Sequence, residues 1–407
     1  LVDLQWGSHA GGHVKCWERF AEAARTVPEL DLTVYYLGPK QTEVTIAPNV
    51  RYQLLPPLLG TDKIPFLRER SRDTDLAPYY PALAKFLRRH DVLHTTSAFT
   101  FSRTAHRVAR KQRIPIVSST HTDLPEFTRI YSRQIISRVV GQGWLNRLLF
   151  DRWKLDEFLA QDMKRQWCSL MGQSDWVLLS KPEDSVLVEG VVPPERTSRL
   201  RRGIDPERFH PKHRDRSRLQ AQFGIPPEVP VLLFVGRVDE TKKVMTMAIA
   251  ARHLLGRGMN LHTLIIGEGS TSPTVQNLLQ THVTLPGVLP QEDLAWIYAS
   301  SDLFVFPSES EVSPNVVLEA RTSGLPVFVS ARDGGAKFVQ QSGVDGVVVS
   351  DPHPNAWAEA LLPYLEESDR RHPMSLAARR CMEEQWPSWE TVLREDLLSI
   401  WEKVSHS

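Results

Sequence analysis

The sequence predicts an α/β protein with two domains, each built on a parallel sheet with helices on both faces. The chain has 407 residues, which exceeds what one ordinary hydrophobic core accommodates. Short apolar runs alternate with helical stretches along its whole length, and most of these runs show no polar alternation. Strands buried on both faces of a parallel sheet have this pattern. Alternation of strands and helices is typical of doubly wound, Rossmann-like sheets.

The predicted strands fall into two sets, one for each domain. The first set is 1–6, 32–37, 50–54, 92–95, 114–119 and 176–180, and the second is 231–236, 261–267, 303–307, 326–330 and 346–350. Helical segments such as 13–24 and 294–299 lie between them. We place the join near 196–218, where nine Lys and Arg residues stand against three acidic residues. A solvated linker explains most of this stretch, although Arg201, Arg202 and Gly203 could instead line an anion-binding cleft.

Composition limits the class of protein further. With 41% hydrophobic residues, 24% charged residues and a net charge of +1, the chain resembles a soluble globular protein with no overall attraction to nucleic acid. It has no apolar run of about 18 residues that would span a membrane, and residues 1–6 read as a strand, not as a charged leader. Cys16, Cys168 and Cys381 lie far apart, without a metal or disulfide pattern. We therefore expect a cytoplasmic protein.

Two cations follow the first predicted strand of the second domain. Arg237 comes directly after strand 231–236, and Lys242 lies in the following turn. Ligands of open α/β sheets collect at the carboxyl ends of the strands. Fixed cations at that place would stabilise the charge that develops on a departing diphosphate. The spacing alone is equally compatible with two ordinary surface residues.

A stronger pattern follows strand 303–307, where a polar loop leads into a short helix. Ser313 is a good N-cap and Pro314 a good first helical residue, and Gly324 provides the stop. A helix that begins at the carboxyl end of a strand directs backbone N–H groups toward a phosphate. Glu311 and Glu319 flank the start and the body of this helix, so one carboxylate can hold a hexose and the other a ribose. The alternative is a pair of solvated glutamates.

A third element is Asp333-Gly334-Gly335-Ala336, which comes after a predicted strand. Paired glycines let the backbone approach a ligand closely. A plain tight turn explains them equally well.

These motifs together resemble glycosyltransferase family 4, the glycosyl transferases group 1, which are retaining enzymes of the GT-B fold. The resemblance is dense over residues 196–390 and thinner before them. It rests on Gly236-Arg237 with Lys242, Pro307-Ser308, Glu311 and Glu319 with seven residues between them, Gly324-Leu-Pro-Val, Arg202-Gly203-Ile-Asp205-Pro-Glu-Arg-Phe209-His-Pro, Ile266-Gly267-Glu268-Gly269 and Gly343-Val-Asp345-Gly346.

The resemblance implies an architecture of two Rossmann-like domains whose parallel sheets face a central cleft. The acceptor-side domain is expected at 1–200 and the nucleotide-sugar domain at 201–385. A last helix over 386–407 would cross back to the first domain. Trp389 and Trp401 would then pack between the domains.

The resemblance also implies an activity: transfer of a hexose-type sugar, with retention, from a UDP- or GDP-sugar to a lipid or glycan acceptor, without a metal or other cofactor. Arg237 and Lys242 would hold the diphosphate, Glu319 the ribose and Glu311 the sugar. Further donor contacts would come from Gly236, Gly267, Ser313, Pro314, Asn315 and Gly334.

Three positions depart from the family pattern. Lys243 stands where the family usually has Gly, and Val312-Ser313 replaces a Gly-Phe or Phe-Gly pair. Phe338 stands where a Glu commonly follows the paired glycines. The last two fall near the expected sugar, so they bear on which sugar is transferred.

In the first domain, strand 1–6 runs into a glycine-rich loop that contains Gly11 and Gly12. The loop resembles the family's first loop, which lets the backbone approach the donor phosphate or the acceptor, although a tight turn is an alternative. His121 lies just past strand 114–119. The resemblance places such a histidine beside the transferred sugar, whereas the residues alone favour a structural role. His94, inside a strand, is the weaker candidate.

Two further features concern partners and metals. Between 129 and 165, eight basic residues stand against four acidic ones, with Trp144 and Trp153 among them. Such a surface can contact the inner face of an anionic membrane. Ordinary helix packing is the alternative. Asp73-Thr-Asp75 has the D-x-D pattern of metal-dependent transferases of another fold. It lacks an adjoining strand, so we expect a loop or capping role and no metal.

Two other classes of protein remain as alternatives. A nucleotide-sugar epimerase or hydrolase of similar fold would act on the donor without an acceptor. A non-catalytic nucleotide-sugar-binding partner would be expected to have lost Arg237, Lys242 or Glu311, and this chain retains all three.

Overall fold

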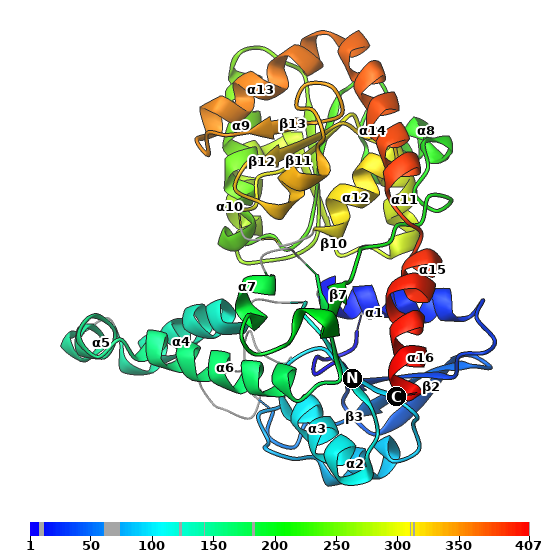
Figure 1. Ribbon diagram of the computed structural model, residues 1–407. Helices are drawn as coiled ribbons and strands as arrows, with labels where there is room; N and C mark the ends of the chain where they lie inside the picture. Colours follow the sequence, from blue (N-terminus) through cyan, green and yellow to red (C-terminus); the bar gives the residue numbers. More distant parts are fainter. Residues whose placement is uncertain are drawn as a thin grey trace. The chain divides into compact units, whose positions relative to one another are not determined.

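The computed structural model describes residues 1–7, 12–60, 74–121, 124–141, 143–180, 184–309, 311 and 314–406. The chain divides into two compact units (Figure 1). Unit 1 comprises Leu1–Arg201 together with Trp389–Ser407, and unit 2 comprises Arg202–Ser388. The chain therefore leaves unit 1 at Arg201 and returns to it at Trp389.

Unit 2 is built on a six-stranded parallel sheet with the order β10-β9-β8-β11-β12-β13. The strands β9 and β10, which follow β8 in the sequence, lie on one side of it, and β11, β12 and β13 lie on the other. The carboxyl ends of β8 and β11 therefore form the switch point at which open α/β sheets bind ligands. The strands are β8 (Val231–Val235), β9 (His262–Ile266), β10 (Val283–Gly287), β11 (Leu303–Phe306), β12 (Val327–Ser330) and β13 (Val347–Val349).

Helices cover both faces of this sheet, with α9, α10 and α13 on one side and α8, α11, α12 and α14 on the other (Figure 1). Every residue of β8, β11 and β12 is buried, as the continuous apolar runs of the sequence predict. The helices are α8 (Arg216–Phe223), α9 (Val244–Gly256), α10 (Ser272–Leu279), α11 (Gln291–Ser300), α12 (Asn315–Thr322), α13 (Pro354–Glu366) and α14 (Arg371–Gln385).

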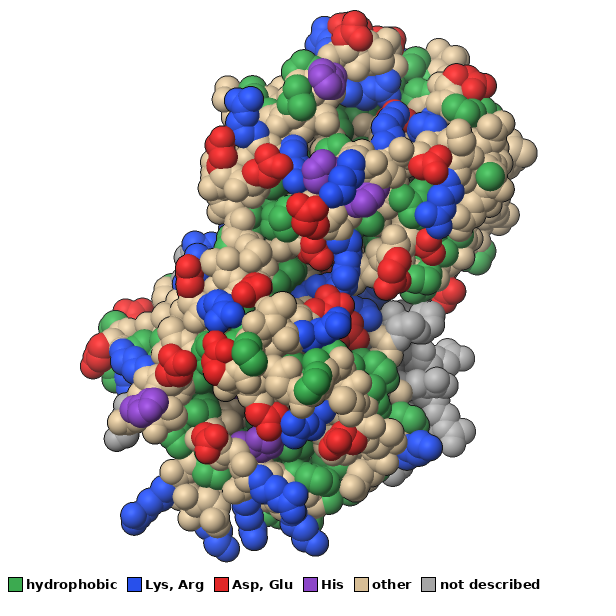
Figure 2. Space-filling view, turned by 90° about the vertical axis from the view of Figure 1, so that its right-hand side faces the viewer, with side chains coloured by type: hydrophobic (Ala, Val, Ile, Leu, Met, Phe, Trp, Pro, Cys, Tyr) green, Lys and Arg blue, Asp and Glu red, His purple; other side chains and the backbone are tan. Residues whose placement is uncertain are grey.

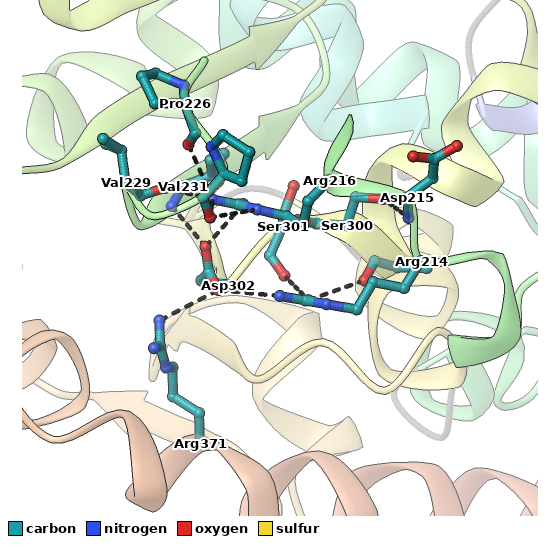
Figure 3. Close-up of polar contacts among 12 residues, drawn as sticks. Arg214, Asp215, Arg216, Pro226, Val229, Val231, Ser300, Ser301, Asp302 and Arg371 are labelled. Atoms are coloured by element: carbon teal, nitrogen blue, oxygen red, sulfur yellow. Dashed lines mark hydrogen bonds and ion pairs between the residues drawn. The ribbon is translucent and has the colours of Figure 1, made fainter. Parts of the chain in front are cut away.

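Part of the basic stretch 196–218 is structural and not a solvated linker. Arg216 donates to the carbonyl oxygens of Val229 and Ser300 and pairs with Asp302, whose carboxylate also accepts from the backbone N–H of Val231 at 2.8 Å (Figure 3). Arg214 and Arg371 approach the same carboxylate at 3.7 and 3.2 Å (Figure 3). This cluster ties together the amino ends of β8 and β11, at the edge of the sheet opposite the switch point.

Unit 1 contains two groups of hydrogen-bonded strands, with the orders β1-β3-β2 and β4-β5-β6-β7. All neighbours are parallel except β2 and β3. The strands are β1 (Leu32–Leu37), β2 (Thr42–Ala47), β3 (Val50–Leu55), β4 (Leu93–Thr95), β5 (Ile116–Ser119), β6 (Trp176–Leu179) and β7 (Thr197–Arg199).

Residues 1–6, predicted as a strand, form a single isolated bridge and not a full strand. They nevertheless run along β1, because Val2 N–H donates to the Tyr35 carbonyl at 2.9 Å and Leu37 N–H to the Leu4 carbonyl at 3.0 Å. On the other side, the Thr96 hydroxyl donates to the Leu1 carbonyl at 2.9 Å. The segment thus connects the two groups of strands.

Two helices of unit 1, α4 and α6, lie side by side, with α5 at their outer end (Figure 1). The C-terminal helices return to α1, where the Trp389 ring lies 5.1 Å from that of Phe20. Trp389 and Trp401, expected between the domains, both belong to a core cluster of unit 1. The helices are α1 (Gly12–Ala24), α2 (Pro81–Leu87), α3 (Thr100–Gln112), α4 (Leu124–Val140), α5 (Trp144–Arg147), α6 (Leu155–Gly172), α7 (Asp184–Val188), α15 (Trp389–Val392) and α16 (Ser399–Ser405), with π-helical turns η2 (Leu148–Arg152) and η9 (Leu393–Leu398).

Arg201, one of the residues considered for an anion-binding cleft, has carboxylate partners within unit 1. Its guanidinium lies 2.6 Å from Asp396 and 2.5 Å from Glu395, both on η9. These two carboxylates already occupy the guanidinium, which removes Arg201 from the candidate anion ligands.

Candidate active site

Close backbone contact shapes the loop after β8. The N–H of Gly236 donates to the Ile266 carbonyl and that of Val238 to the Glu268 carbonyl, each at 2.9 Å. A Cβ atom on Gly267 would lie only 2.0 Å from the Gly236 carbonyl oxygen. Gly267 therefore has a structural reason to be glycine, independent of a ligand.

Asp239 orders the cationic part of this loop. Its carboxylate accepts from the backbone N–H groups of Thr241 and Lys242 at 3.0 and 3.2 Å, which caps the 3₁₀ turn η5 (Glu240–Lys242). The same carboxylate pairs with Arg237 at 3.0 Å. The Arg237 guanidinium also donates to the Thr241 hydroxyl at 3.2 Å, and the side chain remains 60% exposed.

Lys242 and Glu311, both predicted site residues, form an ion pair between the loops after β8 and β11. Only 9% of Lys242 is exposed. Burial, assisted by the nearby charge of Arg237, lowers the pKa of Lys242 to about 8, against the opposing effect of Asp239 and Asp333. The switch point therefore holds a cation that is costly to desolvate and keeps a carboxylate beside it.

Asp333 supports this arrangement and was not recognised as a site residue in the sequence. Its carboxylate accepts from the N–H of Glu311 at 3.0 Å and from that of Gly335 at 2.7 Å. The Glu311 carbonyl in turn accepts from the N–H of Gly334 at 2.9 Å. Burial raises the pKa of Asp333 to about 6. Its position directly before the paired glycines, where Asp commonly bonds the backbone two residues on, was the available signal.

Gly334 and Gly335 thus belong to a turn held against Glu311. A Cβ atom on Gly335 would lie 3.2 Å from Pro314 Cγ and 3.3 Å from Val317. The close approach is to the start of α12, which gives the second glycine a packing reason.

Helix α12 carries Glu319, whose carboxylate is already positioned. It accepts from the Tyr298 hydroxyl at 3.1 Å and from the Gln291 amide at 3.2 Å, both on α11. The helix begins at Asn315 with Pro314 at the N-cap, one residue later than predicted. The predicted cap Ser313 lies outside the described residues, as does Val312. Asn315 Oδ1 is buried and accepts no hydrogen bond from a described residue.

The side chain of Phe338, a position expected to bear on which sugar is transferred, is buried. The residue is 7% exposed, and its ring packs edge-on against Trp386 at 5.4 Å. It belongs to the core of unit 2, because the turn after Gly335 directs the side chain inward.

In unit 1, His121 follows the carboxyl end of β5, as predicted. Its Nε2 lies 2.8 Å from the Ser119 hydroxyl, and its ring stacks on that of His13 at 4.4 Å. This contact of His13, which directly follows Gly12 at the start of α1, was not predicted. Gly11 lies outside the described residues.

Asp75 has the loop role expected of it. Its carboxylate accepts from the backbone N–H groups of Leu58, Leu59 and Ala77. Asp73 lies outside the described residues. Within the described part of the chain, no three His, Cys, Asp or Glu side chains are grouped as metal ligands would be.

Comparison with known proteins identifies the family. The description "Glycosyltransferase Family 4" matches residues 20–208, and "Glycosyl transferases group 1" matches residues 215–380. The chain belongs to this glycosyltransferase family. The resemblance carried by the motifs around Arg237, Glu311 and Glu319 is thereby confirmed.

Relatives and solved structures agree with this assignment. Sulfoquinovosyl transferase SQD2 of Arabidopsis thaliana is 27% identical over 329 residues, or 78% of this chain. The match covers 58% of that enzyme, so the chain spans less than two thirds of its length. Sucrose-phosphate synthase from Thermosynechococcus elongatus matches with a TM-score of 0.70 and 18% identity, over 98% of this chain and 95% of that one.

A further solved structure was determined with a nucleotide sugar. Anabaena Alr3699/HepE, in complex with UDP-glucose, matches this chain with a TM-score of 0.65 and 14% identity over 98% of each chain. At these identities the likeness establishes the GT-B fold. Among the described residues, no helix has both the length and the apolar character needed to cross a membrane.

Proposed function

We propose that this protein is a retaining glycosyltransferase that moves a hexose-type sugar from a UDP- or GDP-sugar to a lipid or glycan acceptor. The observation that carries the proposal is the arrangement of Arg237, Lys242 and Glu311 at the switch point of unit 2. The UDP-glucose complex of a structural neighbour supports a nucleoside diphosphate donor. The proposal includes no metal, because two fixed cations supply the positive charge.

The contacts suggest how the donor would be bound. Its diphosphate would pair with Lys242 in place of Glu311, and it would also pair with the exposed side chain of Arg237. The Glu311 carboxylate would then be free to accept hydrogen bonds from the sugar hydroxyls. Glu319, held by Tyr298 and Gln291, would accept from the ribose hydroxyls.

In the transfer step, the bond from the anomeric carbon to the phosphate oxygen breaks and a bond to the acceptor oxygen forms on the same face of the sugar. The acceptor's proton passes to the departing phosphate oxygen. Arg237 and Lys242 stabilise the charge that develops on that phosphate. We assign to His121 the role of orienting the sugar.

Two neighbouring lysines provide a matched test. Lys242→Met keeps the buried aliphatic part of the side chain and removes the charge. We expect turnover to fall roughly 10²- to 10³-fold, the effect of removing one stabilising group from a transition state. Lys243→Gly removes a charge that is 51% exposed and should leave turnover unchanged. Circular dichroism would establish that both variants fold, and unchanged transfer by folded Lys242→Met would refute the assignment.

A panel of UDP- and GDP-sugars, with and without candidate acceptors, separates the proposal from its alternatives. A transferase forms product only when acceptor is present, apart from slow donor hydrolysis. An epimerase would convert the donor into an isomer without an acceptor. A non-catalytic binding partner would bind UDP or GDP, measured by calorimetry, and form no product.

For the acceptor we propose a lipid-linked substrate, reached by peripheral contact with the cytoplasmic face of an anionic membrane. Among the exposed large hydrophobic side chains of the described residues, the aromatic ones are Trp144, Trp153 and Phe158. All three lie on α5, on α6 or between them, and they are 77%, 63% and 63% exposed. Exposed tryptophans beside basic residues suit the interface of a membrane.

A second surface of unit 1 supports an anionic partner. Helices α2 and α3 and the residues that follow them expose seven basic side chains, and the only acidic residue in 81–113 is Asp91. Figure 2 shows Lys and Arg side chains gathered at the lower end, where Figure 1 places these helices. The seven are Lys85, Arg88, Arg89, Arg107, Arg110, Lys111 and Arg113.

Sedimentation with vesicles tests the membrane contact. We expect the protein to bind phosphatidylcholine vesicles that contain phosphatidylglycerol, and pure phosphatidylcholine vesicles much less. Arg88→Gln with Arg89→Gln should weaken binding roughly 30-fold at about 1 kcal/mol per basic residue. Trp144→Ser with Trp153→Ser should weaken it too, whereas Leu376→Ser, at an exposed position of unit 2, is the control. Equal binding by all variants would contradict the contact.

A further inference from the structure

Three hydrogen bonds connect the C-terminal helix α16 to His121 within unit 1. The indole Nε1 of Trp401 lies 3.0 Å from His94 Nδ1. His94 Nε2 lies 2.8 Å from the Ser119 hydroxyl, and that hydroxyl lies 2.8 Å from His121 Nε2. No pattern in the sequence connects these residues, since it predicts a packing role for Trp401 and a core position for His94.

The donors and acceptors in this series determine where the protons are. An indole N–H can only donate, so His94 Nδ1 must accept and carries no hydrogen. The remaining ring hydrogen of His94 is then on Nε2, which donates to the Ser119 oxygen. Burial holds the pKa of His94 well below its ordinary value, which agrees with a neutral ring.

The hydrogen bond that Ser119 accepts from His94 determines the direction of its hydrogen bond with His121. Its oxygen accepts from His94, so its single hydroxyl hydrogen is available for His121 Nε2. An accepting Nε2 leaves the ring hydrogen of neutral His121 on Nδ1. Each of the three hydrogen bonds has one donor and one acceptor, so the indole N–H of Trp401 determines the tautomer of His121.

Aromatic neighbours hold the same rings in place. The His94 ring lies between Trp17, at 5.0 Å, and Trp401, at 5.7 Å, with both contacts edge-on. The His121 ring is stacked on His13. His94 and Ser119 are 8% and 1% exposed, so water does not compete freely for these hydrogen bonds.

We propose that Trp401, His94 and Ser119 are positioning residues that fix His121 as the neutral tautomer with its hydrogen on Nδ1. Nδ1 of His121, which is buried, is then a hydrogen-bond donor and not an acceptor. The consequence for catalysis rests on the proposed function, which places His121 beside the sugar, whereas the tautomer itself does not.

Nitrogen NMR of protein labelled with ¹⁵N-histidine measures the tautomer directly, because protonated and unprotonated ring nitrogens have well-separated shifts. In the full-length protein near neutral pH, we expect His121 to show a protonated Nδ1 and an unprotonated Nε2. His121→Ala assigns the signals. A wild-type spectrum with hydrogen on Nε2 of His121 would overturn the proposal.

Two variants interrupt the series at different points. Ser119→Ala removes the middle hydroxyl, and Trp401→Phe keeps an aromatic ring in α16 but removes the only N–H. In both we expect the Nε2–H form of His121 to become detectable and turnover to fall about five- to tenfold, as for one lost neutral hydrogen bond. Ser118→Ala is the control, because that hydroxyl on the same strand bonds Thr95 and Ser174 instead.

The outcomes separate the proposal from the proposed function. A shifted tautomer together with reduced turnover supports both. A shifted tautomer with unchanged turnover supports the positioning of His121, and refutes its place beside the sugar if His121→Ala is also fully active. Spectra of Ser119→Ala and Trp401→Phe that match those of wild type and Ser118→Ala would overturn the positioning role.

Discussion

The candidate residues of the two units are held in place by different chemistry. In unit 2, Lys242 is paired with Glu311, Arg237 with Asp239, and the Asp333 carboxylate holds the backbone of Glu311. In unit 1, His121 is hydrogen-bonded to the Ser119 hydroxyl, which is bonded in turn to the His94 imidazole and through it to the Trp401 indole. The candidate residues of unit 2 are therefore held by charged groups, and His121 of unit 1 by neutral ones.

The charged arrangement has a cost that the neutral one avoids. Burial lowers the pKa of Lys242 to about 8 and raises that of Asp333 to about 6, so each group resists the charge that it carries near neutral pH. Breaking a buried charge pair therefore leaves an uncompensated charge, and this is more damaging than losing one neutral hydrogen bond. Variants in unit 2 should accordingly have the larger effects.

The largest effect on stability should come from a buried pair in unit 2 outside the donor loops. Arg321 on α12 is fully buried and lies 2.7 Å from Asp345, whose carboxylate also accepts from the N–H groups of Gln340 and Gln341. Asp345→Asn removes the charge and one accepting oxygen. We expect the free energy of unfolding in urea to fall by about 3–5 kcal/mol.

An exposed pair in the same unit is the control for that measurement. Arg257 and Glu359 are also in contact, but Glu359 is 66% exposed. Glu359→Gln should cost less than about 1 kcal/mol. Similar losses for the two variants would mean that burial does not determine the value of a charge pair here.

The next largest effect should come from Glu311, because the structure gives it two partners in succession. In the free protein it holds Lys242, and with donor bound it would hold the sugar. Glu311→Gln should reduce turnover roughly 10²-fold, in the range for one lost transition-state contact. It should leave the affinity for UDP or GDP unchanged or higher, because Lys242 no longer has a competing carboxylate.

Calorimetry with the free nucleotide and steady-state transfer assays separate these two effects. Loss of nucleotide affinity with unchanged turnover would assign Glu311 to the diphosphate instead of the sugar.

The sequence predicted the parts of this comparison that depend on local pattern. The central strands β8, β11 and β12 are uninterrupted apolar runs, and their carboxyl ends identified Arg237 and Glu311. The missed strands lack this signal: β2 is a half-exposed antiparallel strand, β7 is polar and short, and β10 contains Pro286.

Long-range contacts explain what the sequence did not predict. Asp333 contributes through the backbone of Glu311 on a different loop, and Trp401 acts on His94 across most of the chain. Residues such as these show no periodicity or spacing, since their relation exists only after the strands have paired. The burial of Phe338 against Trp386 was not predicted for the same reason.

A smaller effect should appear in the pH dependence of transfer. Lys242 must be protonated to bind a diphosphate, and its pKa in the free protein is about 8. Below that value its charge is complete, and above it kcat/KM should fall by up to about tenfold per pH unit as the proton is lost. The Lys242→Arg variant keeps a positive charge at this position throughout the pH range. If kcat/KM declines in the same way in that variant, the decline is due to the titration of another group.

The smallest effect concerns backbone conformation, and it should be the same in both units. Lys243 has φ of 54° at the start of α9, and Lys154 of unit 1 has φ of 49° at the start of α6. A side chain costs about 1–2 kcal/mol in this left-handed region, whereas glycine adopts it freely but loses more entropy on folding. At each position the Gly variant should therefore be about 1 kcal/mol more stable than the Ala variant. Both substitutions remove the same charge, so the difference between their free energies of unfolding in urea measures the backbone contribution.

Equal stability of the Gly and Ala variants at Lys243 would mean that the departure from the family's usual glycine has no conformational cost. The side chain of Lys243 would then have to be explained by its contact with Glu309 at 3.9 Å.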